Sequence, residues 1–179
     1  WPGQSGHIHV SLKSKSGDSV FHEAGKPHSM SDAMRWFVGG QQKLMPELLA
    51  MVAPTINSYR RLIPGFWAPT DSTWGVENRT TALRVIPGSP KSQRVEYRVA
   101  AADANPYVIL SAALASGLWG IENKVEPEPV LATATGPAEA QGDPSYYRHP
   151  HDPNRTSPTP RKDEMGMDYI PVYEDEIGA

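Results

Sequence analysis

The 179 residues suffice for one ordinary domain, or for a domain with a small appendage. Cysteine is absent, which excludes disulfides, thiolate metal sites and cysteine nucleophiles. Hydrophobic residues make up 39%, no apolar run approaches the length of a membrane span, and the N-terminus lacks a signal-peptide pattern, so we expect no membrane role.

The formal net charge of −3 conceals a change along the chain. Residues 1–126 carry 13 Lys and Arg against 10 Asp and Glu, whereas residues 127–179 carry 4 against 10. The second stretch also holds half of the 18 prolines. We therefore place a boundary between residues 126 and 142 and predict a mostly irregular, proline-rich tail beyond it.

Residues 6–12 alternate between apolar and polar side chains, which is the period-two pattern of a strand. The polar side of this strand carries His7, His9 and Ser11. The strand therefore presents imidazole and hydroxyl groups to one face of the sheet that contains it.

Two helices are expected. The first runs from a cap at Ser31 to about Val52, because apolar residues recur there at helical spacing. The second covers about residues 107–122, with Asp103 as its N-cap and Pro106 in its first turn.

Between the helices, Pro-Gly and Ala-Pro pairs make residues 57–69 an ordered loop rather than a regular element. Three short strands follow, separated by Gly and Pro, at residues 72–77, 82–86 and 94–100. This order predicts an α+β fold in which helices cover one face of an antiparallel sheet.

Positive charge is concentrated between the two helices, at Arg60, Arg61, Arg79, Arg84, Lys91, Arg94 and Arg98. Strand alternation places Arg94, Glu96 and Arg98 on one face, and a carboxylate between two arginines stays ionised. The pattern fits either a surface ion-pair ladder or a site for nucleotide phosphates, which arginine binds bidentately together with a metal. Residues 1–126 carry only a small net positive charge and have no basic stripe interleaved with aromatic residues, which argues against nucleic-acid binding.

His7 and Glu96 are candidate ligands for that metal, as a nitrogen and an oxygen donor. A lone strand histidine is more often structural than a ligand. Spacing alone leaves both interpretations open.

Four motifs in order resemble the glutamine synthetase family over about residues 2–128. They are GQSGHIHVS at residues 3–11, NSYRRLIPG at 57–65, NRTTALR at 78–84, and RVEYR at 94–98 followed by ANPY at 104–107. The prokaryotic type I branch and its relatives fit best. The resemblance implies a cytoplasmic, ring-forming homo-oligomeric ligase that uses ATP to join the γ-carboxylate of glutamate to ammonia or an amine through γ-glutamyl phosphate.

The resemblance also implies roles for individual residues, in which positioning and charge neutralisation dominate the chemistry. His7 and Glu96 would hold Mg²⁺ or Mn²⁺ beside the ATP γ-phosphate. His9, Ser11 and Lys91 would lie along the nucleotide. Arg79 and Arg84 would face the ATP phosphates and the transferred phosphoryl group. The glutamate substrate would be held by Gly3, Arg61 and Arg98.

One position departs from the family pattern. Glutamine-forming members read aromatic-Glu-Ala-Pro after the Leu-Ile-Pro-Gly motif, and the Glu helps bind and deprotonate ammonium, whereas this chain has Trp67 in that place. An indole accepts no proton and adds an apolar wall. We therefore hypothesise that Trp67 contacts an acceptor amine larger than ammonia.

The resemblance also covers only part of the family's length. A β-grasp domain and further metal-binding glutamates are expected before Trp1, and additional helices after Glu128, so we expect the chain alone to be inactive as a synthetase. A non-catalytic descendant that keeps the fold as a binding or structural unit is the alternative, favoured by the loss of Glu at position 67.

After a linker at residues 129–144, residues 145–176 resemble the small heavy-metal-binding segment of periplasmic adaptor subunits in metal-efflux pumps. The resemblance rests on residues 146–153, 156–158 and 162–173. Candidate ligands for Cu(I) or Ag(I) are His149, His151, Met165 and Met167. A short turn held by Tyr and Pro packing is the alternative. A metal-binding module acting through this tail is thus the third functional hypothesis.

Overall fold

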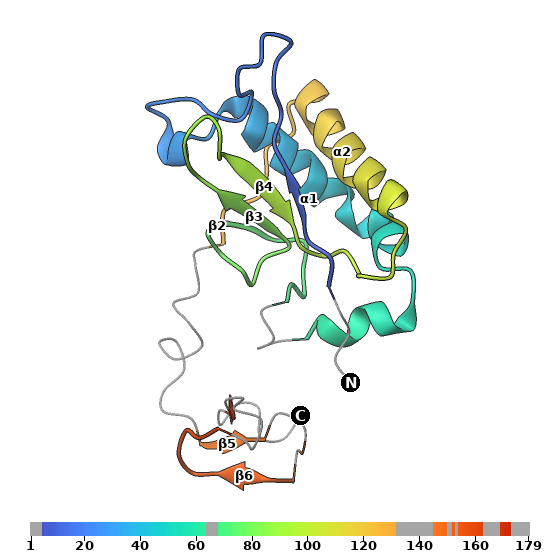
Figure 1. The fold of residues 1–179 in the computed structure, drawn as a ribbon, viewed down its shortest axis with the longest axis vertical. Coiled ribbons are helices and arrows are strands. Elements are labelled where there is room, and N and C mark those ends of the chain that lie inside the picture. Colours follow the sequence, from blue (N-terminus) through green and yellow to red (C-terminus); the bar gives the residue numbers. More distant parts are fainter. Residues whose placement is uncertain are drawn as a thin grey trace. The chain divides into compact units, whose positions relative to one another are not determined.

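The computed structural model describes residues 5–63, 68–131, 145–149, 152, 154–162 and 169–172. The chain divides into two compact units, residues 1–134 and 135–179. The first unit contains, in chain order, β1 (Ile8–Val10), η1 (Pro27–Ser29), α1 (Asp32–Val52), η2 (Ile56–Arg61), β2 (Trp74–Val76), β3 (Leu83–Ile86), β4 (Arg94–Tyr97) and α2 (Pro106–Glu122) (Figure 1). In the described part of the chain, no helix is long and apolar enough to cross a bilayer.

The four strands of the first unit form one sheet in the order β1-β4-β3-β2. β4 pairs antiparallel with both β1 and β3, but β2 and β3 are parallel. The sheet is therefore mixed, and the prediction of an antiparallel sheet was wrong at this pair. The reason is a double reversal between β2 and β3, where the side chain of Asn78 accepts hydrogen bonds from the backbone N–H and hydroxyl of Thr80 at 2.9 and 2.7 Å.

Both helices begin at capped residues. Ser31 caps α1 as predicted, because its Oγ accepts a hydrogen bond from the backbone N–H of Met34 at 3.1 Å. The cap of α2 is Asn105, whose Oδ1 accepts from the backbone N–H of Tyr107 at 3.0 Å. The prediction of Asp103 as the cap was wrong, since a proline at the first helical position places the cap immediately before it.

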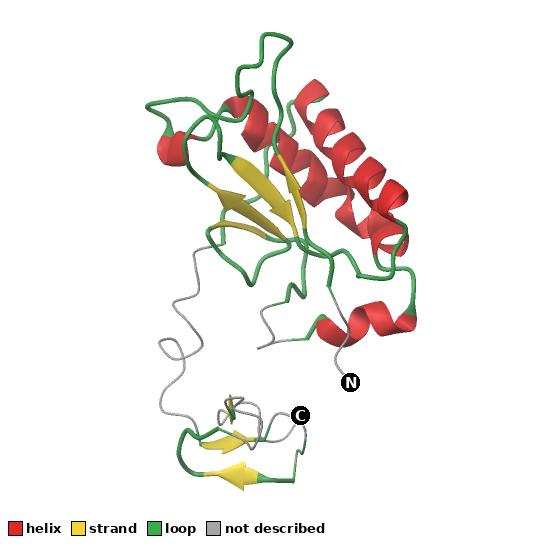
Figure 2. Cartoon of the chain, in the orientation of Figure 1, coloured by secondary structure: helices red, strands yellow, loops and turns green. Residues whose placement is uncertain are grey.

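The two helices lie side by side on the same side of the sheet (Figures 1 and 2). Glycines allow their close approach, because a Cβ on Gly40 would lie 2.3 Å from the Ser116 carbonyl oxygen and one on Gly120 would lie 2.2 Å from that of Trp36. The amide of Gln41 also donates to the Ala113 carbonyl at 2.9 Å.

The core lies between the sheet and these helices. Buried side chains from the strands and the helices form one apolar cluster that includes Leu83, Val85, Val95, Tyr97, Met34, Phe37, Val38 and Ile109. Helices therefore cover one face of the sheet, as the sequence predicts. The opposite face keeps the polar side chains of β1, β3 and β4.

The loop predicted at residues 57–69 begins as the 3-10 helix η2, and residues 64–67 lie outside the described residues. In the second unit, β5 (Tyr146–Arg148), β6 (Thr156–Ser157) and β7 (Ile170–Val172) form an antiparallel sheet in the order β6-β5-β7. This small sheet lies within the tail that was predicted to be mostly irregular.

Candidate active site

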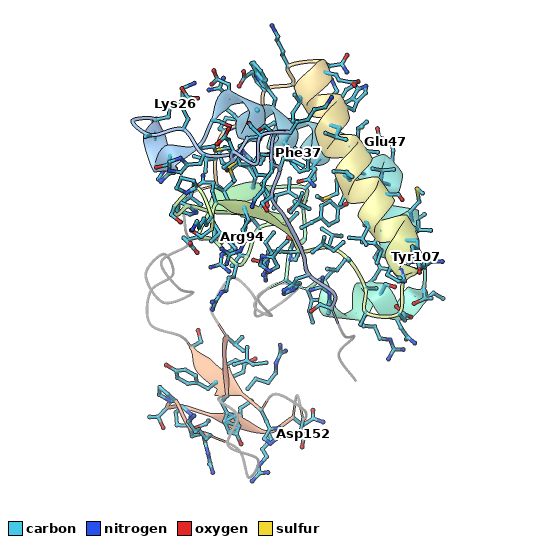
Figure 3. All side chains as sticks on the ribbon, turned by 45° about the horizontal axis from the view of Figure 1, so that its top comes forward. Lys26, Phe37, Glu47, Arg94, Tyr107 and Asp152 are labelled. Carbon is cyan, nitrogen blue, oxygen red and sulfur yellow. The ribbon has the colours of Figure 1, made fainter. Side chains whose placement is uncertain are left out.

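The polar face of the sheet is built by strand register. His9 on β1 pairs with Glu96 on β4, and Glu96 pairs with Arg84 on β3, so that three charged or titratable side chains form one row across the sheet. Figure 3 shows Phe37 on the helical side of the sheet and Arg94 on the other side. The alternation read from the sequence is confirmed by this register.

Glu96 lies at the centre of the row and its side chain is only 3% exposed. Its Oε1 accepts from Arg98 Nη1 at 2.7 Å and lies 2.9 Å from His7 Nδ1. Its Oε2 accepts from Arg84 Nη1 at 3.2 Å. Burial alone raises the pKa of the Glu96 carboxyl, but the charge of Arg98, the protonated form of His7 and the hydrogen bond from Arg84 together outweigh burial and hold the pKa below its usual value. The group is therefore a carboxylate at neutral pH, where Arg98 and Arg84 are charged.

Arg98, beside Glu96, and Arg61, which contacts the Arg98 backbone, are both buried. Burial lowers the pKa of both Arg61 and Arg98, although guanidinium stays charged at any physiological pH. Arg61 Nη2 donates to the carbonyl oxygens of Arg98 and, at 3.3 Å, of Ala100, which ties η2 to the end of β4. Its Nε is buried and finds no acceptor in the described part of the chain. The carbonyl contacts of Nη2 therefore fix the position of the Arg61 guanidinium beside the end of β4.

His7 is a neutral imidazole beside the Glu96 carboxylate. Burial, and then the positive charge of Arg98, lower the pKa of its imidazole, which favours the neutral form that binds metals. Its Nδ1 lies 2.9 Å from Glu96 Oε1, the distance of a hydrogen bond or ion pair between the imidazole and the carboxylate. The two side chains are therefore adjacent, and their role as metal ligands stays a prediction. Among the described residues, no group of three or more His, Asp or Glu side chains is placed to hold an ion.

The structure brings together several of the site residues that the sequence singled out. His7, His9, Arg84, Glu96 and Arg98 lie in one cluster, and Arg79 is exposed but close enough for its charge to lower the pKa of Arg98. Ser11 and Lys91 are exposed, and no described ion pair or hydrogen bond links either side chain to the cluster. These two stay predictions.

Several predicted residues lie outside the described residues. They are Gly3, Trp67, His151, Met165 and Met167. His149, the remaining candidate ligand of the tail, lies edge-on to the ring of Tyr169 with 5.2 Å between centroids, and the guanidinium of Arg161 lies 5.3 Å from the centre of that ring.

Two further residues join the cluster. Glu77, just after β2, accepts hydrogen bonds from Nε and Nη2 of Arg84, the first at 3.0 Å. Arg94 Nε donates to His9 Nδ1 at 3.2 Å. The only sequence signal for Glu77 was that few carboxylates accompany the arginines of this region, because its contact depends on the parallel return of the chain from β2 to β3.

Comparison with known proteins is consistent with this geometry. The family model described as "Glutamine synthetase, catalytic domain" matches residues 1–147. Type-1 glutamine synthetase 2 of Dictyostelium discoideum is 50% identical over 126 residues, which are 70% of this chain and 24% of the relative. A glutamate–isopropylamine ligase of a Pseudomonas species is 42% identical over 135 residues, 75% of this chain and 29% of the relative.

A third relative, gamma-glutamylputrescine synthetase of Escherichia coli, is 42% identical over 123 residues, which are 69% of this chain and 26% of that protein. The chain therefore spans 24–29% of the length of these three relatives.

Proposed function

We propose that this chain, which belongs to the glutamine synthetase family, supplies part of the active site of a ligase that joins the γ-carboxylate of glutamate to ammonia or an amine at the expense of ATP. The observation that carries the proposal is the convergence of His7, Arg84 and Arg98 on the buried Glu96 carboxylate. A surface ion-pair ladder would leave such groups in water, whereas here the carboxylate and Arg98 are both buried.

The arrangement suits phosphoryl transfer. Arg84 and the exposed Arg79 would meet the phosphates, because guanidinium groups bind phosphate oxygens through paired N–H donors. His7 and Glu96 would hold Mg²⁺ or Mn²⁺, and the bound ion would neutralise charge on the transferred phosphoryl group. Glu96 also keeps Arg98 in place by the 2.7 Å bond, so that the arginine is oriented before any ligand binds.

Glutamate would be held on the same face by arginine. Arg98 is oriented by Glu96, and Arg61 has a buried Nε donor without an acceptor in the described residues. Arg61 lies beside Arg98, because its Nη2 donates to the Arg98 carbonyl oxygen, and its positive charge would add to the attraction for a substrate carboxylate. The reaction would then proceed through γ-glutamyl phosphate in a homo-oligomeric ring in the cytoplasm, as the sequence resemblance implies.

The acceptor is proposed to be an amine larger than ammonia. The support is Trp67, which stands where glutamine-forming members have a proton-accepting Glu. Two of the three relatives above are named for amine acceptors, isopropylamine and putrescine. The metal-binding role of the tail stays a prediction, because three of its four candidate ligands lie outside the described residues.

A chimaera tests the proposal. The matched segment of the Dictyostelium type-1 enzyme would be replaced by the matching segment of this chain, and ATP- and glutamate-dependent phosphate release would be measured with ammonium, methylamine and putrescine. We expect phosphate release with a preference for an amine, and a shift toward ammonium in the Trp67→Glu variant.

Two results would contradict this account. A folded chimaera that releases no phosphate with any acceptor refutes the ligase role. An active chimaera that prefers ammonium, with no change on Trp67→Glu substitution, refutes the amine assignment alone.

A further inference from the structure

Arg84 lies between two carboxylates, and all three of its guanidinium nitrogens are engaged. Nε and Nη2 donate to Oε2 of Glu77, the first at 3.0 Å, while Nη1 donates to Oε2 of Glu96 at 3.2 Å. The Arg84 side chain is 16% exposed, whereas that of Glu77 is 46% exposed. The planar guanidinium is therefore fixed at both ends, with Glu77 on the solvent side.

Glu96 has several other neighbours. Arg98 donates to it at 2.7 Å and His7 Nδ1 lies at 2.9 Å, both at Oε1, whereas Arg84 reaches Oε2 at 3.2 Å. A carboxylate that interacts with three groups holds each of them less firmly than a dedicated partner would. Glu77 makes no ion pair other than that with Arg84 among the described residues, so it is the dedicated partner.

The backbone that presents Glu77 is itself fixed. Its φ is +53°, in the left-handed region that a residue with a side chain of this type rarely adopts. Its N–H donates to the Val85 carbonyl oxygen at 3.0 Å, and the next residue, the buried Asn78, holds the following turn through its bonds with Thr80. The left-handed conformation is therefore held by contacts on both sides and places the carboxylate beside Arg84.

We propose that Glu77 is a positioning residue that holds the Arg84 guanidinium beside Glu96, ready to receive a phosphate group. This inference rests on the proposed function, which places phosphates at Arg84. An arginine that is already oriented loses less side-chain freedom when it binds an anion, so its contribution to affinity is larger.

Glu77 also has an opposing effect, because its negative charge repels phosphate. Two variants separate the effects. Glu77→Gln removes the charge but keeps an oxygen that accepts a hydrogen bond, whereas Glu77→Ala removes both. If positioning dominates, Ala weakens phosphate binding more than Gln does. If repulsion dominates, both variants strengthen it.

A matched control is present in the same chain. Glu126 accepts hydrogen bonds from the same two nitrogens of Arg35, Nε at 2.7 Å and Nη2 at 3.0 Å, one at each carboxylate oxygen, and Arg35 lies on α1 outside the polar face of the sheet. Glu126→Ala removes one carboxylate and one paired arginine contact, as Glu77→Ala does, together with a bond from Trp36 Nε1 at 2.8 Å, while Arg35 keeps its ion pair with Asp32. It therefore controls for loss of charge and of a surface ion pair.

The first measurement is hydrogen exchange of the arginine Nε–H groups by nuclear magnetic resonance in the 179-residue chain without nucleotide. We expect the Nε–H of Arg84 to exchange faster with water in Glu77→Ala but not in Glu126→Ala. The Nε–H of Arg35 should exchange faster in Glu126→Ala but not in Glu77→Ala. Unchanged exchange at Arg84 in Glu77→Ala overturns the inference. Amide spectra of each variant establish that the fold is kept.

The second measurement is calorimetric titration of the same proteins with ATP and Mg²⁺. We expect Glu77→Ala to bind about twofold to fivefold more weakly, the scale of one partly exposed ion pair, with Glu77→Gln closer to wild type and Glu126→Ala unchanged. Equal or tighter binding by Glu77→Ala overturns the inference and leaves the proposed function standing. If the wild-type chain binds no nucleotide, the same titration is made on the chimaera, where equal or tighter binding by Glu77→Ala overturns the inference; the proposed function itself is refuted only by a folded chimaera that releases no phosphate.

Discussion

Replacing Glu96 by alanine would leave buried positive charge without its partner. The Arg98 and Glu96 side chains are 5% and 3% exposed, and 2.7 Å separates their closest atoms. Removing one member of a pair buried to this degree destabilises a protein by about 3–5 kcal/mol. The loss of the Arg84 contact adds little to this destabilisation, because Arg84 is more exposed and keeps its bond to Glu77. We therefore expect Glu96→Ala to lose about 3–5 kcal/mol of unfolding free energy, a large share of the typical total of about 5–15 kcal/mol.

Urea denaturation of the 179-residue chain, followed by tryptophan fluorescence, measures this loss. With a slope of about 2 kcal/mol per molar urea, the midpoint falls by about 2 M in Glu96→Ala. The double variant Glu96→Leu/Arg98→Leu removes both charges and should recover most of the stability, since an apolar pair can replace a buried ion pair at little loss. A midpoint for Glu96→Ala within about 0.5 M of wild type, which is about 1 kcal/mol at this slope, would refute the reasoning.

Two further predictions concern the helices. Gly120→Ala should lower the free energy of unfolding by about 1–3 kcal/mol or more, because its Cβ would lie 2.2 Å from the Trp36 carbonyl oxygen, a backbone atom that cannot easily move away. Urea denaturation measures this loss, and a value below about 0.5 kcal/mol would contradict the close packing of the helices. Asn105→Ala should lower the free energy of unfolding by about 1 kcal/mol, because it removes the capping hydrogen bond from the Tyr107 N–H, and Asp103→Ala should lower it by less in the same assay. A larger loss in Asp103→Ala would mean that Asp103 is the capping residue.

The polar face could be predicted from the sequence because strand geometry fixes side-chain direction. Alternation at residues 6–12 placed His7 and His9 on one face, and alternation at 94–98 did the same for Glu96 and Arg98. Joining the two sets required the pairing of β1 with β4, which spacing does not specify. The resemblance to a known family supplied that step.

The errors share a physical cause, since each depends on how the backbone turns. The chain reverses twice between β2 and β3, which makes that pair parallel and brings Glu77 to Arg84. The spacing of hydrophobic residues does not indicate such a turn, and the left-handed backbone conformation of Glu77 is not expected for glutamate. Asp103 and Asn105 are both good capping residues, and only the adjacent Pro106 distinguishes them.

The central claim is that His7 and Glu96 form one side of a divalent-metal site on this face. Titration of the chain with Mn²⁺ in the presence of ATP, followed through the ring signals of its six histidines, tests it most directly. We predict that paramagnetic broadening affects His7 before His22 and His28, and that Glu96→Gln removes this preference. Broadening of His22 or His28 at the same or lower Mn²⁺ concentration, or an unchanged order in Glu96→Gln, would contradict the claim.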